Sequence, residues 1–464
     1  MSEVRIKEVQ PLRNMGFWMI WAVGVGSVVG DGIFLLLGEG IEVGGPSAVW
    51  GFFLAGLIQM CIMISLGEVA VGMPNAGAMS VWVERYMGKS WGLLSGMTFS
   101  VGWVVLGGSI SIALGRFTCY WFPSVDLEIG TIVFAALFFT VFTIMNIVGT
   151  AIAAKGQLIF VLILVAIMVL FGILGIKEID VANYTPWMPN GFAGFAATIP
   201  MGTFAYMGAV CIATSGSECR DPRDLGKALV WASITFIVMY TVDMLVVIGI
   251  IPWEQVSLDV SPFTQAAEVA FGYAGGFILN IAAWLAAATC LIMGTLYTPS
   301  RIFYQMSKDG YLPKFFGELN EKTRTPIKGL ICIWVVGMLF ILLGYFDATG
   351  VYVVLCNQAT IAWILSWGLA TIAGILYRRE MGSDRIRNEV GWKQPLYPLF
   401  PIISIGGCLY VLYLCFYDWV QFVGVAIWVV IYLLWYNGSI KKKIAKGLIH
   451  ETVIEKVEVQ KKHK

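Results

Sequence analysis

Long apolar runs alternate with short polar segments along this chain. Twelve of these runs have about 20 residues or more and few charged side chains, which is the length that a helix needs to cross a hydrocarbon layer of about 30 Å. Because backbone groups in hydrocarbon must be hydrogen-bonded within their own segment, each run is predicted to be a helix. The predicted spans are 15–38, 47–72, 91–121, 128–150, 156–176, 192–217, 228–250, 270–298, 327–345, 349–377, 396–416 and 418–437.

The composition also indicates a chain that spans a membrane. Apolar residues make up 58% of the 464 residues and charged residues make up 13%, with a mean hydropathy of +0.80. Soluble domains carry about a quarter charged residues. With a net charge of +1 and no basic stripe before the tail, the sequence predicts the lipid bilayer as its surroundings and no nucleic-acid partner.

The positive charges predict how the chain is oriented. If the N-terminus is cytoplasmic, all of the 30 Lys and Arg residues except Arg116 and Lys177 fall on cytoplasmic segments, as the positive-inside rule requires. The sequence therefore predicts a multi-pass protein of the cell (plasma) membrane with both termini cytoplasmic. Its parts are a cytoplasmic segment at 1–14, a transmembrane domain at 15–437 and a cytoplasmic basic tail at 438–464.

Two of the predicted helices contain helix-weakening residues at corresponding places. The first contains VGVGSVVGDGIF at 23–34, and the sixth contains IPMGTFAYMGAV at 199–210. Interrupted helices five segments apart indicate a transporter that is built from inverted repeats. The predicted fold is an all-α membrane protein with twelve transmembrane helices: repeat one at about 15–176, repeat two at about 192–377, and two additional helices at about 396–437, with helices 1 and 6 broken.

The glycine-rich stretch of the first helix is predicted to line a cavity near the middle of the membrane. Glycine costs about 1 kcal/mol in a helix interior, and a cluster of glycines loosens the hydrogen-bond ladder. In a membrane, freed N–H and C=O groups are tolerated only where they face protein or a wet cavity. Glycines can instead serve close helix packing, but the acid Asp31 between Gly30 and Gly32 favours a binding site.

Four motifs resemble those of the amino acid–polyamine–organocation permeases. The first-helix motif of that family is similar to VGSVVGDGIF at 25–34, and its second-helix segment is similar to ISLGEVAVGMPNAGAMSVWVERYMG at 64–88. The sixth helix and its following loop resemble FAYMGAVCIATSGSECRDPRDLGKAL at 204–229. The most specific match is the loop after helix eight, which resembles SRIFYQMSKDGYLPKFFGELNEKTRTP at 300–326.

This resemblance covers about residues 12–437 and implies a LeuT-like fold that transports by alternating access. The implied substrate site is formed by Val28, Val29, Gly30, Asp31 and Gly32 of helix 1 and by Phe204, Ala205, Tyr206, Gly208 and Ala209 of helix 6. A substrate amine is expected at carbonyl groups of the helix breaks, and a carboxylate at the N–H groups of residues 30–32. Phe204 is expected to act as a gate over the ligand.

The chain departs from the family pattern at three positions. Asp31 stands where relatives often have Ser or Thr, and Leu164 lies near the place where many proton-coupled relatives have a lysine. Ala209 and Val210 follow Gly208, where relatives often have an aromatic or polar residue. The third departure predicts a smaller and more apolar pocket wall.

Asp31 leaves three interpretations open. A carboxylate at the bilayer centre costs about 2.5–3.5 kcal/mol on insertion scales. A cationic ligand bound by Asp31, a proton that it loads and releases, or the dipole of a half-helix would each offset that cost. An ionised Asp31 favours amines without a carboxylate, such as polyamines or amino alcohols, whereas a protonated Asp31 accepts zwitterionic amino acids.

A few other polar residues lie inside apolar runs. Asp243 in helix 7 and Glu68 near the inner end of helix 2 are coupling candidates, like Asp31, although helix packing or an inner gate is the expected role of Glu68. Glu218 is expected to pair with an Arg or Lys at the inner face. Arg116, toward the outer part of helix 3, either reaches the headgroups or pairs with an acid of an outer gate. Trp363 and Trp367 lie in mid-segment of helix 10, where they either shape the cavity or pack in the core, and core packing is the expected role.

The predicted function is a secondary active transporter of small amino acids or related amines that is coupled to protons or exchanges substrates, with sodium as the less favoured ion. The alternatives are a transporter restricted to cationic amines, a non-transporting nutrient sensor of the same fold, and a channel. No enzyme activity and no cofactor is predicted. No metal site is predicted, because the nine cysteines form no CxxC pair and both histidines lie in the tail.

Overall fold

The computed structural model describes residues 11–256, 261–345, 348–415 and 419–449, and within these ranges the chain is helical. The α-helices are α1 (Phe17–Val28), α2 (Asp31–Gly44), α3 (Ala48–Gly72), α4 (Met79–Met87), α5 (Lys89–Cys119), α6 (Leu127–Val148), α7 (Thr150–Gly175), α8 (Gly191–Ala205), α9 (Cys211–Thr214), α10 (Arg223–Ile250), α11 (Pro262–Thr289), α12 (Thr298–Lys308), α13 (Ile327–Leu343), α14 (Ala348–Met381), α15 (Ser383–Arg385), α16 (Leu399–Cys415), α17 (Trp419–Trp435) and α18 (Lys441–Ala445). The 3-10 and π-helical pieces are η1 (Gly45–Ser47), η2 (Ile176–Glu178), η3 (Val181–Tyr184), η4 (Met207–Val210), η5 (Ser215–Ser217), η6 (Trp253–Gln255), η7 (Cys290–Tyr297), η8 (Lys314–Gly317), η9 (Ile386–Val390) and η10 (Tyr436–Ile440).

The apolar runs of the sequence lie on this helical structure wherever it is described. Nine helical stretches of the described residues are long and apolar enough to cross a membrane, and α13 and α16 are shorter apolar helices. The eighth run continues beyond its predicted end at 298, because α11, η7 and α12 follow one another without a loop as far as Lys308.

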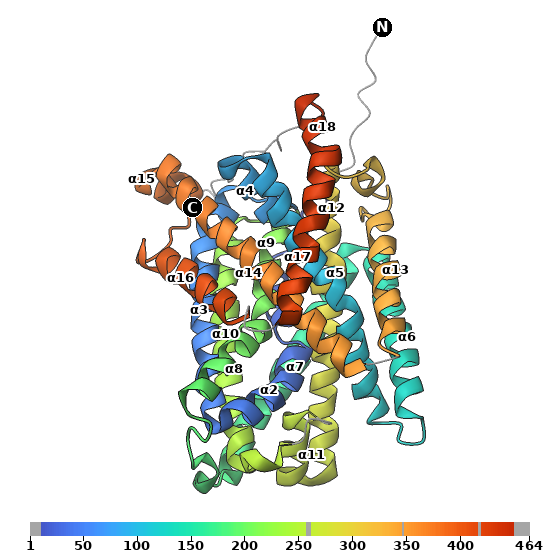
Figure 1. Cartoon of the computed structure of the whole chain (residues 1–464), viewed down its shortest axis with the longest axis vertical. Coiled ribbons are helices and arrows are strands. Elements are labelled where there is room, and N and C mark those ends of the chain that lie inside the picture. Colours follow the sequence, from blue (N-terminus) through green and yellow to red (C-terminus); the bar gives the residue numbers. More distant parts are fainter. Residues whose placement is uncertain (1–10, 257–260, 346–347, 416–418, 450–464) are drawn as a thin grey trace, which may run out of the picture.

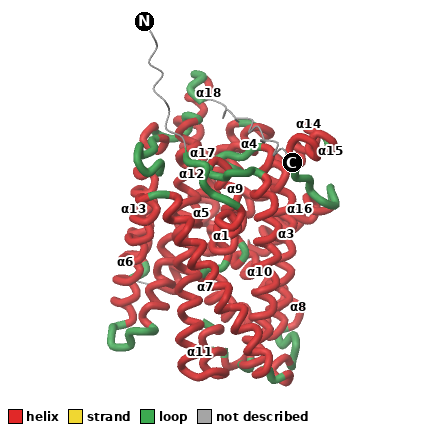
Figure 2. The backbone as a smooth tube through the Cα atoms, turned by 180° about the vertical axis from the view of Figure 1, so that it is seen from behind, coloured by secondary structure: helices red, strands yellow, loops and turns green. Residues whose placement is uncertain are grey.

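Most long helices run side by side along the long axis of the molecule (Figures 1 and 2), whereas α14 crosses it obliquely (Figure 1). α5 packs against α14, α6 and α13, while α3 packs against α10 and α8. α1 lies inside this arrangement, where it contacts α7, α10, η4 and η7. Its residues from Ile20 to Val28 are all buried, so this part of α1 is surrounded by protein, whereas Trp18 in its first turn is exposed.

The outer surface carries large apolar side chains. Leu137 of α6, Leu162 of α7, Leu339 of α13 and Leu434 of α17 are each more than half exposed. A soluble monomer rarely exposes contiguous apolar surface of this kind. Lipid tails are as apolar as leucine and cover such a surface without cost, so this belt is what a membrane-embedded bundle requires.

The bundle has two distinguishable ends. α4, α12 and α18 lie at one end, called the α18 end below, and α11 extends to the opposite end (Figure 1). At the α18 end, Met15 forms the one β-bridge of the described residues, with Cys219. This bridge fastens the segment before α1 to the loop between η5 and α10.

Candidate functional site

The first helix is interrupted between Val28 and Asp31. α1 ends at Val28 and α2 begins at Asp31, while Val29 and Gly30 between them have non-helical ψ angles of 86° and −165°. The carbonyl groups at the end of α1 therefore lack the N–H partners that a continuing helix would supply. Glycine is needed at Gly30 for space, because a Cβ atom there would collide with the Sγ atom of Cys290.

Side chains of other helices hydrogen-bond the carbonyl groups at this break. The Tyr240 hydroxyl of α10 donates to the Val28 carbonyl over 3.0 Å, and the Cys290 thiol of η7 donates to the Ser27 carbonyl over 3.2 Å. A buried carbonyl without a partner costs about 1–3 kcal/mol. The two side chains thus stabilise the interrupted conformation.

The sixth apolar run is irregular beside this break. Pro200 lies inside α8, and α8 is followed by the 3-10 helix η4 at Met207–Val210. Gly208 of η4 packs against the backbone of Ser27 and Val28, and a Cβ atom at this position would lie 2.5 Å from the Val28 nitrogen. The two irregular segments therefore touch backbone to backbone, a close approach for which glycine is the suitable residue.

Three aromatic side chains from different helices meet next to the two interruptions. Phe204 of α8 stacks on Trp363 of α14 with ring centroids 6.4 Å apart, and Trp103 of α5 lies 4.5 Å from Trp363. The Trp363 indole donates to the Phe99 carbonyl over 3.0 Å, which fixes its orientation. Gly32 leaves room for Phe204, because a Cβ atom there would lie 2.9 Å from Cε1 of the Phe204 ring.

These segments enclose a small cavity. Its wall consists of Ser27, Val28, Gly30, Gly32, Trp103, Leu106, Ile110, Phe204, Ala205, Met207, Gly208, Cys290 and Trp363. The space that the centre of a water molecule can reach is about 20 Å³, which holds about one water. This space is too small for a ligand of amino acid size, which requires the wall to move.

The cavity wall includes six of the ten residues that the sequence predicts as substrate contacts. They are Val28, Gly30, Gly32, Phe204, Ala205 and Gly208. Val29 and Ala209 are buried but do not line the cavity, and Tyr206 turns toward α10, where its ring lies 5.0 Å from that of Tyr240. Asp31 begins α2, but its side chain lies outside the described residues.

The rest of the wall was not predicted from the sequence as a substrate site. It is supplied by α5, η7 and α14, together with two residues next to the interruptions: Trp103, Leu106, Ile110, Cys290, Trp363, Ser27 and Met207. Most of these are apolar residues in apolar helices, where nothing in the pattern separates a cavity wall from a packed core. The one signal was the position of Trp363, because tryptophans of spanning helices are enriched at the two membrane interfaces rather than in mid-segment.

Asp243 of α10 is buried away from the cavity. Its side chain faces α7, since a Cβ atom at Gly172 would lie 2.7 Å from Oδ1, and its Oδ2 finds no hydrogen-bond partner among the described residues. Asp243 lies three residues beyond Tyr240, on the same face of α10. Asp243 is therefore one helical turn along α10 from Tyr240, whose hydroxyl donates to the Val28 carbonyl.

Glu68 and Arg116 lie outside the cavity wall as well. Glu68 of α3 forms a buried ion pair with Arg378 of α14 and accepts the backbone N–H of Gln394 over 2.6 Å. The Arg378 guanidinium also lies 4.7 Å from the ring centroid of Tyr397. Glu68 thus joins α3, α14 and the segment before α16, while Arg116 lies in the last turn of α5.

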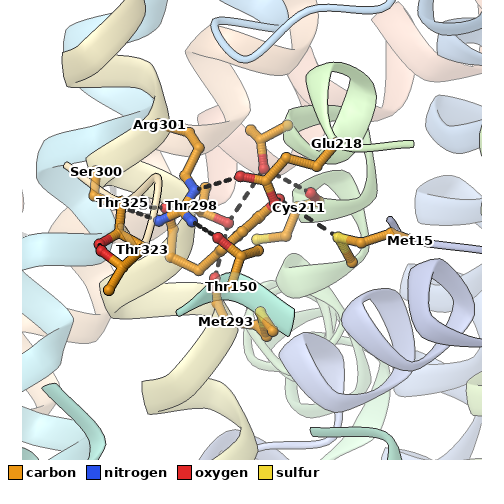
Figure 3. Close-up of polar contacts among 12 residues, drawn as sticks. Met15, Thr150, Cys211, Glu218, Met293, Thr298, Ser300, Arg301, Thr323 and Thr325 are labelled. Atoms are coloured by element: carbon orange, nitrogen blue, oxygen red, sulfur yellow. Dashed lines mark hydrogen bonds and ion pairs between the residues drawn. The ribbon is translucent and has the colours of Figure 1, made fainter. Parts of the chain in front are cut away.

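A second buried polar cluster is formed around Glu218 and Arg301, as Figure 3 shows. Arg301 of α12 pairs with Glu218 over 3.2 Å and donates to the Thr150 hydroxyl over 2.6 Å. The Tyr297 hydroxyl donates to the other Glu218 oxygen over 2.8 Å, and the Met15 N–H donates to the Glu218 carbonyl over 3.0 Å. The expected partner of Glu218 is therefore Arg301, and the cluster joins four separate parts of the chain.

Comparisons of the sequence with known proteins find amino acid permeases. The model of the amino acid permease family matches residues 20–448. The chain is 29% identical to the amino-acid permease RocE of Bacillus subtilis, over 93% of this chain and 96% of that protein. It is 22% identical to the D-serine/D-alanine/glycine transporter of Escherichia coli K12, over 83% of this chain and 84% of that protein.

The fold also resembles a solved transporter structure. Mhp1, a nucleobase-cation-symport-1 family transporter in a closed conformation with bromovinylhydantoin bound, superposes with a TM-score of 0.56 at 15% sequence identity. The match covers 88% of this chain and 94% of that chain. A likeness at this identity concerns the fold alone.

Proposed function

Because this chain belongs to the amino acid permease family, we propose that it is a secondary active transporter that moves small amino acids across a cell membrane by alternating access. Its relatives are transporters rather than enzymes, and the protein is a multi-pass membrane permease. The observation that carries the proposal is the small cavity beside which two irregular helices touch. A transporter that works by alternating access needs such a site between its helices, where it can face either side in turn.

The cavity offers both kinds of partner that an amino acid needs. The carbonyls of Ser27 and Val28 are hydrogen-bond acceptors for an ammonium group, and they are held now by the Cys290 thiol and the Tyr240 hydroxyl. The first N–H groups of α2, next to Gly30, have no side-chain cap and suit a carboxylate. A substrate would exchange places with the thiol and hydroxyl donors at the carbonyls.

We further propose that the bundle has twelve spanning helices arranged as two inverted repeats. α1–α2, α3, α5, α6 and α7 make repeat one, and α8–η5, α10, α11–η7, α13 and α14 make repeat two, with α16 and α17 appended. Each set of five begins with an irregular helix, which supports this assignment. Lys and Arg are concentrated in the segments that lie at the α18 end of the bundle, which supports cytoplasmic termini.

Coupling is proposed to involve a carboxyl group, and hence a proton, rather than sodium. The candidates are Asp31, which lies in the sequence between the cavity-lining residues Gly30 and Gly32, and Asp243, which lies one helical turn from Tyr240 on α10. The ion pair of Glu68 with Arg378 favours a structural role for Glu68.

Two closures are proposed to separate the cavity from the two sides. The Glu218–Arg301 cluster closes the cytoplasmic side, because its members come from the segment before α1, from η7 and α12, and from the loop after η5. Phe204, stacked on Trp363, is the proposed gate directly over the ligand. Arg116 remains a candidate for an outer gate.

Counterflow in proteoliposomes tests the proposed function. Vesicles that contain the purified protein are loaded with an unlabelled amino acid, and uptake of the same labelled amino acid is followed for alanine, leucine, serine, glutamate and arginine. A transporter gives saturable accumulation with at least one of them. Flux that rises linearly with concentration would indicate a channel, and binding without any counterflow would indicate a sensor.

A further inference from the structure

One side chain of the cavity wall carries a hydrogen-bond donor that is left without an acceptor. Trp103 of α5 is 2% exposed, and its indole N–H finds no hydrogen-bond partner among the described residues. The indole beside it behaves differently, since Trp363 donates to the Phe99 carbonyl over 3.0 Å. A buried donor without an acceptor costs about 1–3 kcal/mol. The indole nitrogen is only a donor, so an acceptor atom is the one kind of partner that can satisfy it.

The packing of Trp103 fixes which part of the ring is engaged elsewhere. The six-membered ring lies against Gly294 of η7, where a Cβ atom would be 2.7 Å from Cη2 of Trp103. The ring centroid of Trp103 lies 4.5 Å from that of Trp363, with the two ring planes at 40°. The atoms of Trp103 that meet Gly294 belong to the six-membered ring, so the five-membered ring, which carries the N–H, takes no part in that contact.

The wall around Trp103 is otherwise apolar. Leu106 and Ile110 follow it on α5 at helical spacing, and Trp363 faces it from α14. Gly30 lines the same cavity at the start of α2, where backbone N–H groups are available. Trp103, Leu106, Ile110 and Trp363 carry no charge, so a cationic or anionic side chain of a ligand placed against this part of the wall would be buried there without a partner, which is costly.

We propose that Trp103 is a specificity-determining residue whose indole N–H donates to a carboxylate oxygen of the bound amino acid, while Leu106, Ile110 and Trp363 receive an apolar side chain. This inference rests on the proposed function. The second carboxylate oxygen accepts from the N–H groups at the start of α2. The substrate class is then neutral amino acids with an apolar side chain, rather than cationic amines that lack a carboxylate.

The test compares two indole deletions. Trp103→Phe removes the N–H and keeps an aromatic ring. Trp367→Phe is the matched control, because the Trp367 indole is also buried without a hydrogen-bond partner among the described residues but does not line the cavity. Half-saturation is measured by counterflow for L-alanine, L-leucine, L-phenylalanine, L-arginine and 3-methylbutylamine, which is leucine without its carboxylate.

Wild type is expected to prefer one of the three apolar amino acids over L-arginine and over 3-methylbutylamine. Trp103→Phe should raise the half-saturating concentration of that amino acid about tenfold or more, as the loss of a hydrogen bond to a charged group implies. Trp367→Phe should leave it within twofold of wild type. Equal half-saturation in Trp103→Phe and wild type, or a preference of wild type for L-arginine, would overturn the inference.

A second variant tests the apolar subsite without touching Trp103. Ile110→Phe narrows the wall and is expected to shift the ratio of L-alanine to L-leucine transport toward alanine by several fold, and an unchanged ratio would contradict the assignment. Failure of the proposed function looks different, because wild type would then show no counterflow with any amino acid.

Discussion

At the scale of single residues, the candidate site depends on three glycines, which have no side chain beyond the Cα atom. Gly30, Gly32 and Gly208 each lie where a Cβ atom would meet another part of the cavity wall. Gly208 is the most restrictive of the three, because its neighbour is the backbone of Ser27 and Val28 and not a side chain that can turn away. The contact between the two irregular helices is therefore a contact between main chains.

Gly208→Ala should disrupt this contact. The added methyl group would push η4 away from the end of α1, and overpacking of this kind costs about 1–3 kcal/mol. We expect a lower unfolding temperature of the purified protein and a loss of counterflow. Gly368→Ala is the control, because Gly368 of α14 has nothing within 4 Å of its would-be Cβ atom, and this variant should behave like wild type. Normal counterflow in Gly208→Ala would show that the contact is not needed.

At the scale of elements, the proposed closure of the α18 end is the Glu218–Arg301 cluster. It links η7 and α12 to the loop that follows η5, and the Met15–Cys219 bridge adds the segment before α1. Arg301 and Glu218 are almost fully buried, so neither charge is solvated unless the elements separate. Opening of this end thus requires several helices to move together.

Cys219 next to this cluster should report its opening. The thiol is 1% exposed and donates to the Asp221 carbonyl over 2.8 Å. Burial, with a smaller contribution from the negative charge of Asp224, raises the pKa of the Cys219 thiol to about 12. Because the thiolate is the reactive form, alkylation of Cys219 at pH 7.5 should be slow and should accelerate as the pH rises toward that pKa.

Glu218→Gln should accelerate the alkylation of Cys219 by N-ethylmaleimide, because Arg301 loses its charged partner and the closed arrangement is destabilised. The rate is measured by mass spectrometry of the peptide that contains Cys219. Glu318→Gln is the control, because Glu318 pairs with Lys328 on the surface, where both side chains are more than half exposed. Equal rates in wild type and Glu218→Gln would mean that the ion pair does not hold the end closed.

At the scale of the whole molecule, helices far apart in the chain are fastened near their ends by a second buried ion pair. Glu68 of α3 and Arg378 of α14 are 2% and 9% exposed, and Glu68 also accepts the Gln394 N–H. In the same segment, Trp392 packs between Gly67 of α3 and Gly226 of α10. The segment between α14 and α16 is thus tied to two other helices.

Glu68→Gln should destabilise the protein by about 3–5 kcal/mol, because it leaves the Arg378 charge buried without its partner. The measurement is thermal unfolding in detergent. Glu318→Gln is the control, and it should destabilise the protein by about 0–1 kcal/mol, because its ion pair is exposed. Replacing both Glu68 and Arg378 by Met should restore much of the stability, since an apolar pair needs no countercharge. A Glu68→Gln protein of wild-type stability whose transport no longer depends on pH would instead identify Glu68 as a coupling residue.

The extent to which the sequence predicted the site differs between its two halves. For Val28, Gly30, Gly32, Phe204 and Gly208 two signals were available. Glycine and proline in the apolar runs indicated where the helices are interrupted, and the resemblance to the permease family implied that the substrate contacts lie there. The other half of the wall comes from α5, η7 and α14, whose apolar residues look like any helix interior. The sequence could not predict the orientation of Tyr206 either, because its position in the irregular run does not reveal that its ring turns toward α10.

The order of apolar runs determined, without any tertiary information, that this chain is a membrane-embedded helical bundle whose first and sixth runs carry residues unsuited to a regular helix. The reason is that hydrocarbon leaves a backbone few alternatives to the helix, so hydropathy alone dictates the element. Only the tertiary structure decided that Trp103, Cys290 and Trp363 meet at the first break, and that Glu218 pairs with Arg301. Such encounters depend on how helices rotate and cross, which spacing along a chain does not encode.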